Sequence, residues 1–191
     1  MAREFELKYR ADAETLAAIE RDYTGFEPIS METTYYNTPD GELGNRRWTL
    51  RRRFENGISV CTLKTPGTGG SCGEWEIEAD DILTAIPQLV ADGAPEELSA
   101  LTANGIIESC AARFTRLACK IGLEECTVEL ALDSGFLLGG GRELPFAEVE
   151  VELKAGSEEA AAAFAQSLAV KFGLTPEPKS KLQRALELTK S

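Results

Sequence analysis

Short segments of this chain alternate between apolar and charged residues. Strict alternation predicts β-strands, because successive side chains of a strand point to opposite faces. In residues 3–10, one face of the predicted strand carries Phe5, Leu7 and Tyr9. The opposite face carries Glu4, Glu6, Lys8 and Arg10. A face this polar either meets water or lines a site for a charged ligand.

Later segments with β-type patterns are also predicted as strands. They lie near 33–38, 46–55, 58–65, 74–78, 113–122, 126–134 and 145–154. Asn56-Gly57 is a favoured two-residue turn, so 46–55 and 58–65 are expected to pair as a hairpin. Most of the predicted strands therefore belong to an antiparallel sheet.

Helical periodicity and capping residues predict helices between the strands. Asp12 is a candidate N-cap for a first helix, and Ser157 and Gly173 are expected to bound a helix from about 158 to 172. Others are predicted from about 82, from about Pro95 and around 180–189. The fold class is therefore α+β in a single domain of residues 1–191.

The alternation gives most of these strands one charged face. The residues on these faces are Arg51 and Arg53; Thr62 and Lys64; Glu74, Glu76 and Glu78; Arg116 and Lys120; Glu129 and Asp133; and Glu148, Glu150 and Glu152. For any single strand, a sheet with one face on the core and the other in water is enough to explain this alternation. Three glutamates at i, i+2 and i+4, however, repel one another unless cations lie among them. A barrel of about eight strands can hold one small ligand inside, so the set favours charged faces turned inward.

The balance of charges narrows the possible functions. The chain has 32 acidic and 20 basic residues, a net charge of −12 and no histidine. We therefore expect no nucleic-acid partner, since a general basic surface is lacking. Without histidine, Ser-His and Cys-His catalysis and histidine-ligated metals are excluded.

Cysteines and apolar runs indicate the compartment. Five cysteines show no CxxC spacing and are expected to be reduced thiols: Cys61, Cys72, Cys110, Cys119 and Cys126. No apolar run approaches the length of a membrane span, and no signal-peptide core follows Met1. We expect a cytoplasmic protein with no membrane partner; no oligomeric state follows from the sequence.

The charged residues themselves point to phosphoryl chemistry. Carboxylate clusters without histidine favour hard cations such as Mg²⁺ or Mn²⁺, which take oxygen ligands. Arginine and lysine clusters suit phosphate, arginine through its bidentate fork and lysine as a point charge. Carboxylates that can bind a metal and basic side chains that can bind phosphate are expected on the same sheet. Together they predict a phosphorylated small molecule as ligand.

In an ordered series of motifs, the chain resembles the CYTH, or triphosphate tunnel metalloenzyme, superfamily. The first is Glu4-Phe5-Glu6-Leu7-Lys8, which matches an N-terminal Glu-x-Glu-x-Lys strand. The others are Tyr35-Tyr36-Asn37-Thr38-Pro39, Leu50-Arg51-Arg52-Arg53, Thr62-Leu63-Lys64, Glu74-Trp75-Glu76, Phe114-Thr115-Arg116, residues 129–135, residues 148–152 and Ser180-Lys181-x-x-Arg184. Asn37 replaces the usual aspartate, and Cys72 or Ser71 stands where an arginine is often found.

The resemblance implies an eight-stranded antiparallel β-barrel, or tunnel, with flanking helices, which binds triphosphate with Mg²⁺ or Mn²⁺. It implies phosphate-binding roles for Lys8, Arg51, Arg53, Lys64, Arg116, Lys181 and Arg184. The metal ligands it implies are Glu4, Glu6, Glu150 and Glu152 first, and then Glu74, Glu76, Glu129, Asp133 and Glu148. The residues expected to act most directly in catalysis are Glu4, Glu6, Lys8 and Arg53. The reaction expected is hydrolysis of inorganic triphosphate to diphosphate and phosphate.

Three other functions stay open at this stage. A related enzyme acting on an organic triphosphate, such as thiamine triphosphatase or class IV adenylyl cyclase, would need an aromatic or apolar pocket at the tunnel mouth. A non-catalytic domain that senses polyphosphate or nucleotides would use the same residues. A purely structural barrel would leave its charged face in water.

Overall fold

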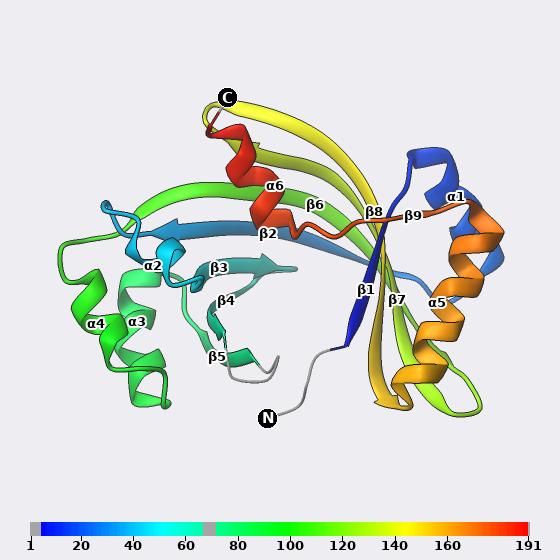
Figure 1. Ribbon diagram of the computed structural model, residues 1–191, viewed down its shortest axis with the longest axis horizontal. Helices are drawn as coiled ribbons and strands as arrows, with labels where there is room; N and C mark the ends of the chain where they lie inside the picture. Colours follow the sequence, from blue (N-terminus) through cyan, green and yellow to red (C-terminus); the bar gives the residue numbers. More distant parts are fainter. Residues whose placement is uncertain (1–4, 67–71, 191) are drawn as a thin grey trace.

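The computed structural model describes residues 5–66 and 72–190 and is built around one strongly curled antiparallel sheet (Figure 1). The strands follow the order β5-β4-β3-β2-β6-β7-β8-β1-β9. Their bounds are β1 Glu6–Arg10, β2 Glu27–Asn37, β3 Thr49–Glu55, β4 Ile58–Pro66, β5 Cys72–Glu78, β6 Ile107–Gly122, β7 Cys126–Gly139, β8 Arg142–Gly156 and β9 Thr175–Pro176. The α+β, antiparallel prediction is confirmed.

The sheet departs from the predicted barrel in strand number and in closure. It has nine strands, and within the described residues no ladder joins its two edge strands, β5 and β9. The extra strand, β9, has 2 residues and pairs with the end of β1. Two residues are too few for a periodic signal, and closure depends on pairing between distant segments. The tunnel is therefore a curled, open sheet.

Some predicted strand bounds were also wrong. Arg46 and Arg47 precede β3 instead of belonging to it, and Arg47 has a positive φ of 58°. The short helix α2 (Glu42–Asn45) ends just before them. The long strands β2, β6, β7 and β8 extend well past the predicted segments. The tight turn at Asn56-Gly57 is confirmed, with φ values of 45° and 95°.

The predicted helices are present, and all but the last of them cover the outer face of the sheet in two groups (Figure 1). Helices α1 (Ala13–Asp22) and α5 (Glu158–Phe172) pack against β8, while α3 (Ile82–Ala91) packs against β4 and β5. Helix α4 (Glu97–Thr102) lies beside α3 and begins two residues after Pro95. Asp12 and Ser157 cap α1 and α5, and Gly173 ends α5 in a left-handed conformation, as predicted.

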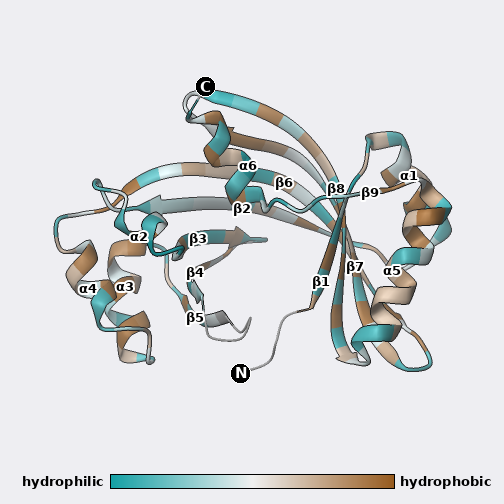
Figure 2. Ribbon diagram, in the orientation of Figure 1, coloured by the Kyte–Doolittle hydropathy of each residue, from teal (hydrophilic) through white to brown (hydrophobic). Residues whose placement is uncertain are grey.

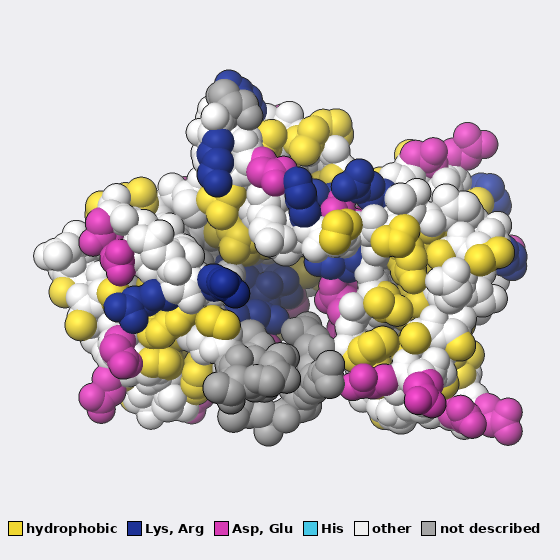
Figure 3. Space-filling view, viewed as in Figure 1, with side chains coloured by type: hydrophobic (Ala, Val, Ile, Leu, Met, Phe, Trp, Pro, Cys, Tyr) yellow, Lys and Arg dark blue, Asp and Glu magenta, His cyan; other side chains and the backbone are white. Residues whose placement is uncertain are grey.

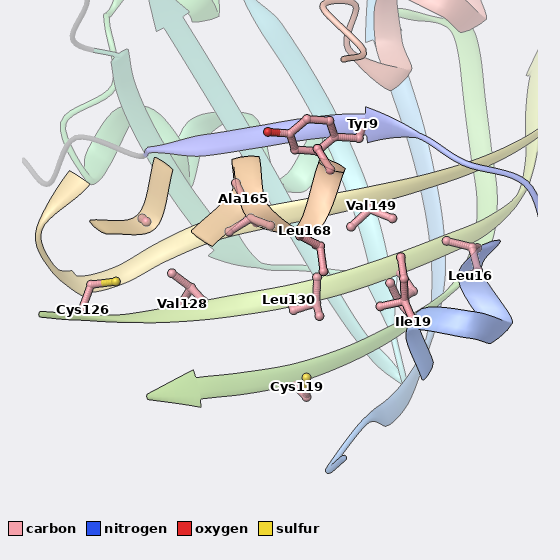
Figure 4. Packing of buried hydrophobic residues seen from close by; sticks show 14 residues of the cluster. Tyr9, Leu16, Ile19, Cys119, Cys126, Val128, Leu130, Val149, Ala165 and Leu168 are labelled. Carbon is pink, nitrogen blue, oxygen red and sulfur yellow. The ribbon is translucent and has the colours of Figure 1, made fainter. Parts of the chain in front are cut away.

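Residues opposite the charged face of each strand form two outer cores. One joins Tyr9, Leu130 and Val149 of the sheet to Leu168 of α5 (Figure 4). The other joins Leu50 and Leu63 to Leu89 of α3. Figure 2 shows hydrophobic and hydrophilic residues following one another along β1 and β8. The alternation seen in the sequence therefore separates a packed outer face from a polar inner face.

The last helix, α6 (Lys181–Leu188), lies on the inner face of the sheet. Its Ala185 is fully buried in a third core with Met31, Ala112 and Leu137. No helix within the described residues is long and apolar enough to cross a membrane.

Candidate functional site

A cavity of about 420 Å³ lies on the inner face, between the two arms of the curled sheet and the start of α6. Figure 3 shows acidic and basic side chains gathered in a hollow at the middle of the molecule. The cavity is lined by Glu6, Thr33, Tyr35, Arg51, Arg53, Lys64, Glu74, Glu76, Phe114, Arg116, Glu150, Glu152, Lys154, Ser180 and Lys181. Side chains from seven strands thus meet around one space, as the alternation predicted.

One wall of the cavity is basic. Arg51 and Arg53 lie on the inner face of β3, opposite the face that carries the buried Leu50. Lys64 lies on the neighbouring strand β4, across from Thr49. The Nε atoms of Arg51 and Arg53 are buried without a hydrogen-bond partner among the described residues. Burial, reinforced by the charge of Arg53, lowers the pKa of Arg51. This wall therefore has unused donors and positive charge for an anion.

Two carboxylates of β5 lie beside the cations of the basic wall. Lys64 Nζ is 3.0 Å from Glu74 Oε1, and Arg51 Nη2 is 3.9 Å from Glu76 Oε1. Tyr35, on the neighbouring β2, also lines the cavity. Burial raises the pKa of its hydroxyl although Arg51, Arg53 and Lys181 oppose the shift, so Tyr35 stays a neutral donor.

The opposite wall, formed by β1 and β8, is acidic. Glu6 lies directly across from Glu152, and Lys8 lies across from Glu150. Lys8 Nζ is 3.8 Å from Glu6 Oε1. Two carboxylates facing each other across antiparallel strands destabilise the pair unless a cation neutralises them. Lys8 and Lys154, whose Nζ lies 2.8 Å from Glu152 Oε2, supply positive charge beside the Glu6–Glu152 pair, and the carboxylate oxygens on the cavity wall can also bind a metal cation.

Beyond these walls, a buried network joins three carboxylates to three cations. Arg116 donates to both oxygens of Asp133, with Nε–Oδ1 at 2.8 Å and Nη2–Oδ2 at 2.7 Å, and it also contacts Glu150. Lys181 Nζ lies 2.7 Å from Asp133 Oδ2 and 2.8 Å from Glu150 Oε1. Lys181 and Arg184 both contact Glu148. The network neutralises its own charges.

The start of α6 brings two of these cations to the network. Ser180 caps the helix in a reciprocal box, in which it accepts from Gln183 N at 3.1 Å and donates its own N–H to the Gln183 side chain at 2.8 Å. Lys181 and Arg184 are three residues apart and therefore share one side of the helix. The Ser-Lys-x-x-Arg motif thus both starts the helix and aims its cations.

Ion pairing shifts the pKa values of the network. Burial works to raise the pKa of Glu150, but Lys181 and Arg116 outweigh it and hold that pKa well below its ordinary value. Burial works to lower the pKa of Lys181, but Asp133, Glu150 and Glu148 raise it. Glu150 therefore remains ionised at neutral pH and able to bind a cation.

Glu150→Gln is expected to lower the free energy of unfolding of the metal-free protein by about 3 kcal/mol at pH 7, because it removes one partner of a buried ion pair. The folded-state pKa of Glu150 lies below its unfolded-state pKa, which is near 4.5. The ionised carboxylate therefore contributes fully to the free energy of unfolding above the unfolded-state pKa, and this contribution is lost as the pH falls through the folded-state pKa. The difference between variant and wild type should therefore shrink at about pH 3.5. Urea unfolding at both pH values measures it.

Glu143→Gln is the matched control, since Glu143 is exposed on the same strand. Its effect is expected to stay within about 0.5 kcal/mol at either pH. A penalty for Glu150→Gln that does not depend on pH would contradict the assignment of its ion pairs.

Two groups of carboxylates are candidates to hold a divalent metal. Oxygens of Asp133, Glu148 and Glu150 all lie within 4.8 Å of one another. These oxygens already accept from Arg116, Lys181 and Arg184, and neither Asp133 nor Glu148 lines the cavity. Glu6, Glu150 and Glu152 line it together and offer oxygen ligands, although Glu150 also contacts Lys181 and Glu152 contacts Lys154, each at 2.8 Å. Because all three face the cavity, this second group is the better placed to bind a hard cation together with a ligand in the cavity.

The structure places ten of the predicted site residues on the cavity wall. They are Glu6, Arg51, Arg53, Lys64, Glu74, Glu76, Arg116, Glu150, Glu152 and Lys181. Asp133 and Glu148 lie behind the wall in the buried network, and Lys8 lies on the inner face beside Glu6. Glu4 and Ser71 lie outside the described residues.

Two predicted residues face other surroundings. Arg184 lines a second cavity with Arg10 and Glu177, and its Nη1 is 3.7 Å from Glu177 Oε2. Glu129 lies 3.5 Å from Lys154 Nζ and lines a third cavity near Lys120.

Five residues on the cavity wall were not among the predicted phosphate or metal ligands: Thr33, Tyr35, Phe114, Lys154 and Ser180. Lys154 continues the series Glu148, Glu150, Glu152 at every second residue, so the alternation contained the signal. Its Nζ lies 2.8 Å from Glu152 Oε2. The other four are neutral and give no charge signal, although Tyr35, Phe114 and Ser180 stand within the motifs of the family resemblance.

Comparisons with known proteins agree with this geometry. The model of the CYTH domain family matches residues 2–186. An inorganic triphosphatase of Haemophilus influenzae is 29% identical over 145 residues, which cover 73% of this chain and 40% of that protein. The chain thus spans less than half the length of that relative.

Solved structures share the fold. A protein from Hippeastrum, described as an adenylyl cyclase candidate with a dominant triphosphatase activity, has a TM-score of 0.69 at 18% identity, covering 97% of this chain and 95% of that one. An adenylate cyclase candidate from Bacillus halodurans has a TM-score of 0.63 at 23% identity, covering 95% and 96%. At such identities the likeness concerns the fold alone.

Proposed function

Because the chain belongs to the CYTH domain family, we propose that it hydrolyses inorganic triphosphate to diphosphate and phosphate with the help of a divalent cation. One observation carries the proposal. The basic wall of Arg51, Arg53 and Lys64 and the acidic wall of Glu6, Glu150 and Glu152 face one cavity of about 420 Å³. Such a cavity offers donors to phosphate oxygens and oxygen ligands to a metal.

The reaction needs positioning and charge stabilisation more than covalent catalysis. Water attacks a terminal phosphorus, a new P–O bond forms and the bridging P–O bond breaks. The electron pair of the broken bond leaves with diphosphate, and the proton of the water passes to solvent. Arg51, Arg53 and Lys64 stabilise the charge that gathers on the phosphate oxygens.

The acidic wall has a different part in this reaction. Glu6, Glu150 and Glu152 would hold Mg²⁺ or Mn²⁺, which neutralises phosphate charge and activates water when it is bound. Lys181 lies between the cavity and the network and holds Glu150 through a contact of 2.8 Å. It therefore orients a proposed metal ligand. The chemistry uses no histidine.

The aromatic residues favour an inorganic substrate over an organic one. Tyr9 and Trp75 pack in the outer cores, and Tyr36 and Trp48 pack against the core beneath α3. Within the described residues, the aromatic side chains that line the cavity are Tyr35 and Phe114, and both are buried. A nucleobase or thiamine ring would thus find no exposed stacking surface among them.

The proposal is tested by phosphate release from inorganic triphosphate, thiamine triphosphate and ATP, each with Mg²⁺ and with Mn²⁺. We expect the highest kcat/KM for inorganic triphosphate. A higher kcat/KM for an organic triphosphate would show that the proposed substrate is wrong. Tight binding without any turnover would show that the protein is a polyphosphate-binding domain and not an enzyme.

A further inference from the structure

Two buried threonines on the inner face differ in what their hydroxyl groups meet. Thr62, on β4, is 1% exposed, and its Oγ1 donates to Glu76 Oε1 at 3.1 Å. Thr33, on β2, is 2% exposed and lines the cavity. Its Oγ1 is buried and has no hydrogen-bond partner within residues 5–66 and 72–190. An unpaired buried hydroxyl lowers stability and needs a physical explanation.

The cross-strand neighbours of Thr33 offer its hydroxyl no side-chain acceptor: on the β6 side the neighbour is Ala112. Thr33 lies directly across from Arg53, as Tyr35 does from Arg51. The Nε atoms of both arginines are also buried and unpaired among the described residues. A guanidinium group has no acceptor, so it cannot take the proton of Thr33. We call Thr33 Oγ1, Arg51 Nε and Arg53 Nε the donor patch; its members share the need for an acceptor from the cavity.

We propose that Thr33 binds substrate directly, donating a hydrogen bond from its hydroxyl to an oxygen of the phosphoryl group that Arg51 and Arg53 hold. The choice of triphosphate as ligand rests on the proposed function, whereas the need for an oxygen anion rests on the donor patch alone. A neutral donor adds direction without adding charge. It therefore favours a phosphoryl group in one orientation.

Valine has nearly the shape of threonine and suits a strand equally well. Thr33→Val should therefore raise the Tm of the ligand-free protein by about 2–4 °C, because it removes an unpaired buried hydroxyl. The same change should weaken the binding of triphosphate by about tenfold to a hundredfold, since the lost bond ends on a charged oxygen. A residue with a purely structural role would not give opposite changes in stability and affinity.

Calorimetric titration with inorganic triphosphate in chelator measures affinity apart from turnover. Thr33→Ser keeps the hydroxyl and should retain most of the affinity. Thr33→Ala also lacks it and should bind as weakly as Thr33→Val. Thr34→Val, next along the strand and on the outer face, should leave the affinity unchanged. Thr62→Val removes a paired hydroxyl and should lower the Tm.

Unchanged affinity in Thr33→Val together with a lower Tm would overturn the inference, because a water molecule would then be the partner of the hydroxyl. The proposed function fails separately. If wild type binds triphosphate without hydrolysing it and Thr33→Val still weakens binding, the role of Thr33 stands and the enzymatic proposal does not. If wild type hydrolyses triphosphate and Thr33→Val binds it normally, only the inference about Thr33 fails.

Discussion

Replacing Arg53 with alanine is expected to lower kcat for inorganic triphosphate by about 10²–10³-fold, the loss typical of removing one preorganised donor to a charged transition state. Arg53 lines the cavity, and its buried Nε has no partner among the described residues. Its Nη1 is 3.1 Å from Glu55 Oε1, so the guanidinium is already held in place before substrate binds. Initial rates of phosphate release measure the effect.

Arg52 provides the matched control for this prediction. It precedes Arg53 on β3 but points to the outer face, where its Nη1 donates to Asp80 O at 2.8 Å. Arg52→Ala removes the same charge from the same strand and should change kcat less than about twofold, because surface substitutions away from a site are nearly neutral. Equal losses in both variants would mean that net charge, and not placement in the cavity, determines the rate.

Removal of divalent metal is expected to abolish turnover. Glu6, Glu150 and Glu152 offer oxygen ligands on one wall, and two of them face each other across β1 and β8. Without a cation, the basic wall can still bind the anion, but no metal neutralises the phosphate charge on this side or activates the attacking water. Activity in excess chelator should fall to background and return on addition of Mg²⁺ or Mn²⁺.

Glu152→Gln tests which carboxylates hold the metal. We expect it to raise the Mn²⁺ concentration needed for half-maximal activity by about tenfold or more, the change expected for loss of about 1.4 kcal/mol of binding free energy. Glu143→Gln, on the same strand outside the cavity, should leave that concentration unchanged. Full activity in chelator, or an unaltered Mn²⁺ requirement in Glu152→Gln, would rule out this metal site.

Residues close together in the sequence revealed most of the site. Alternation placed Arg51 and Arg53 opposite Leu50, and Glu150 and Glu152 opposite Val151, and the structure confirms both faces. Caps at Asp12 and Ser157 and the turn at Asn56-Gly57 are likewise local and were found from the sequence. These features depend on the backbone geometry of a few neighbouring residues.

Features that depend on distant contacts were missed. Lys181 of α6 meets Asp133 and Glu148, so these carboxylates lie in an ion network behind the cavity wall. No local pattern reports these contacts, the nearer of which joins residues 33 positions apart in the sequence. The open form of the sheet and the short β9 also depend on contacts between distant segments. Thr33 carries no charge, so its place on the wall became visible only with its cross-strand neighbour Arg53.

Crystals grown with Mn²⁺ and inorganic triphosphate, measured at the manganese absorption edge, test most directly whether both walls of the cavity act on one ligand. We predict an anomalous peak bound by Glu6, Glu150 and Glu152, with phosphate oxygens reaching from it to Arg51 and Arg53. Triphosphate on the outer face of the sheet, or manganese bound away from this cavity, would contradict the account.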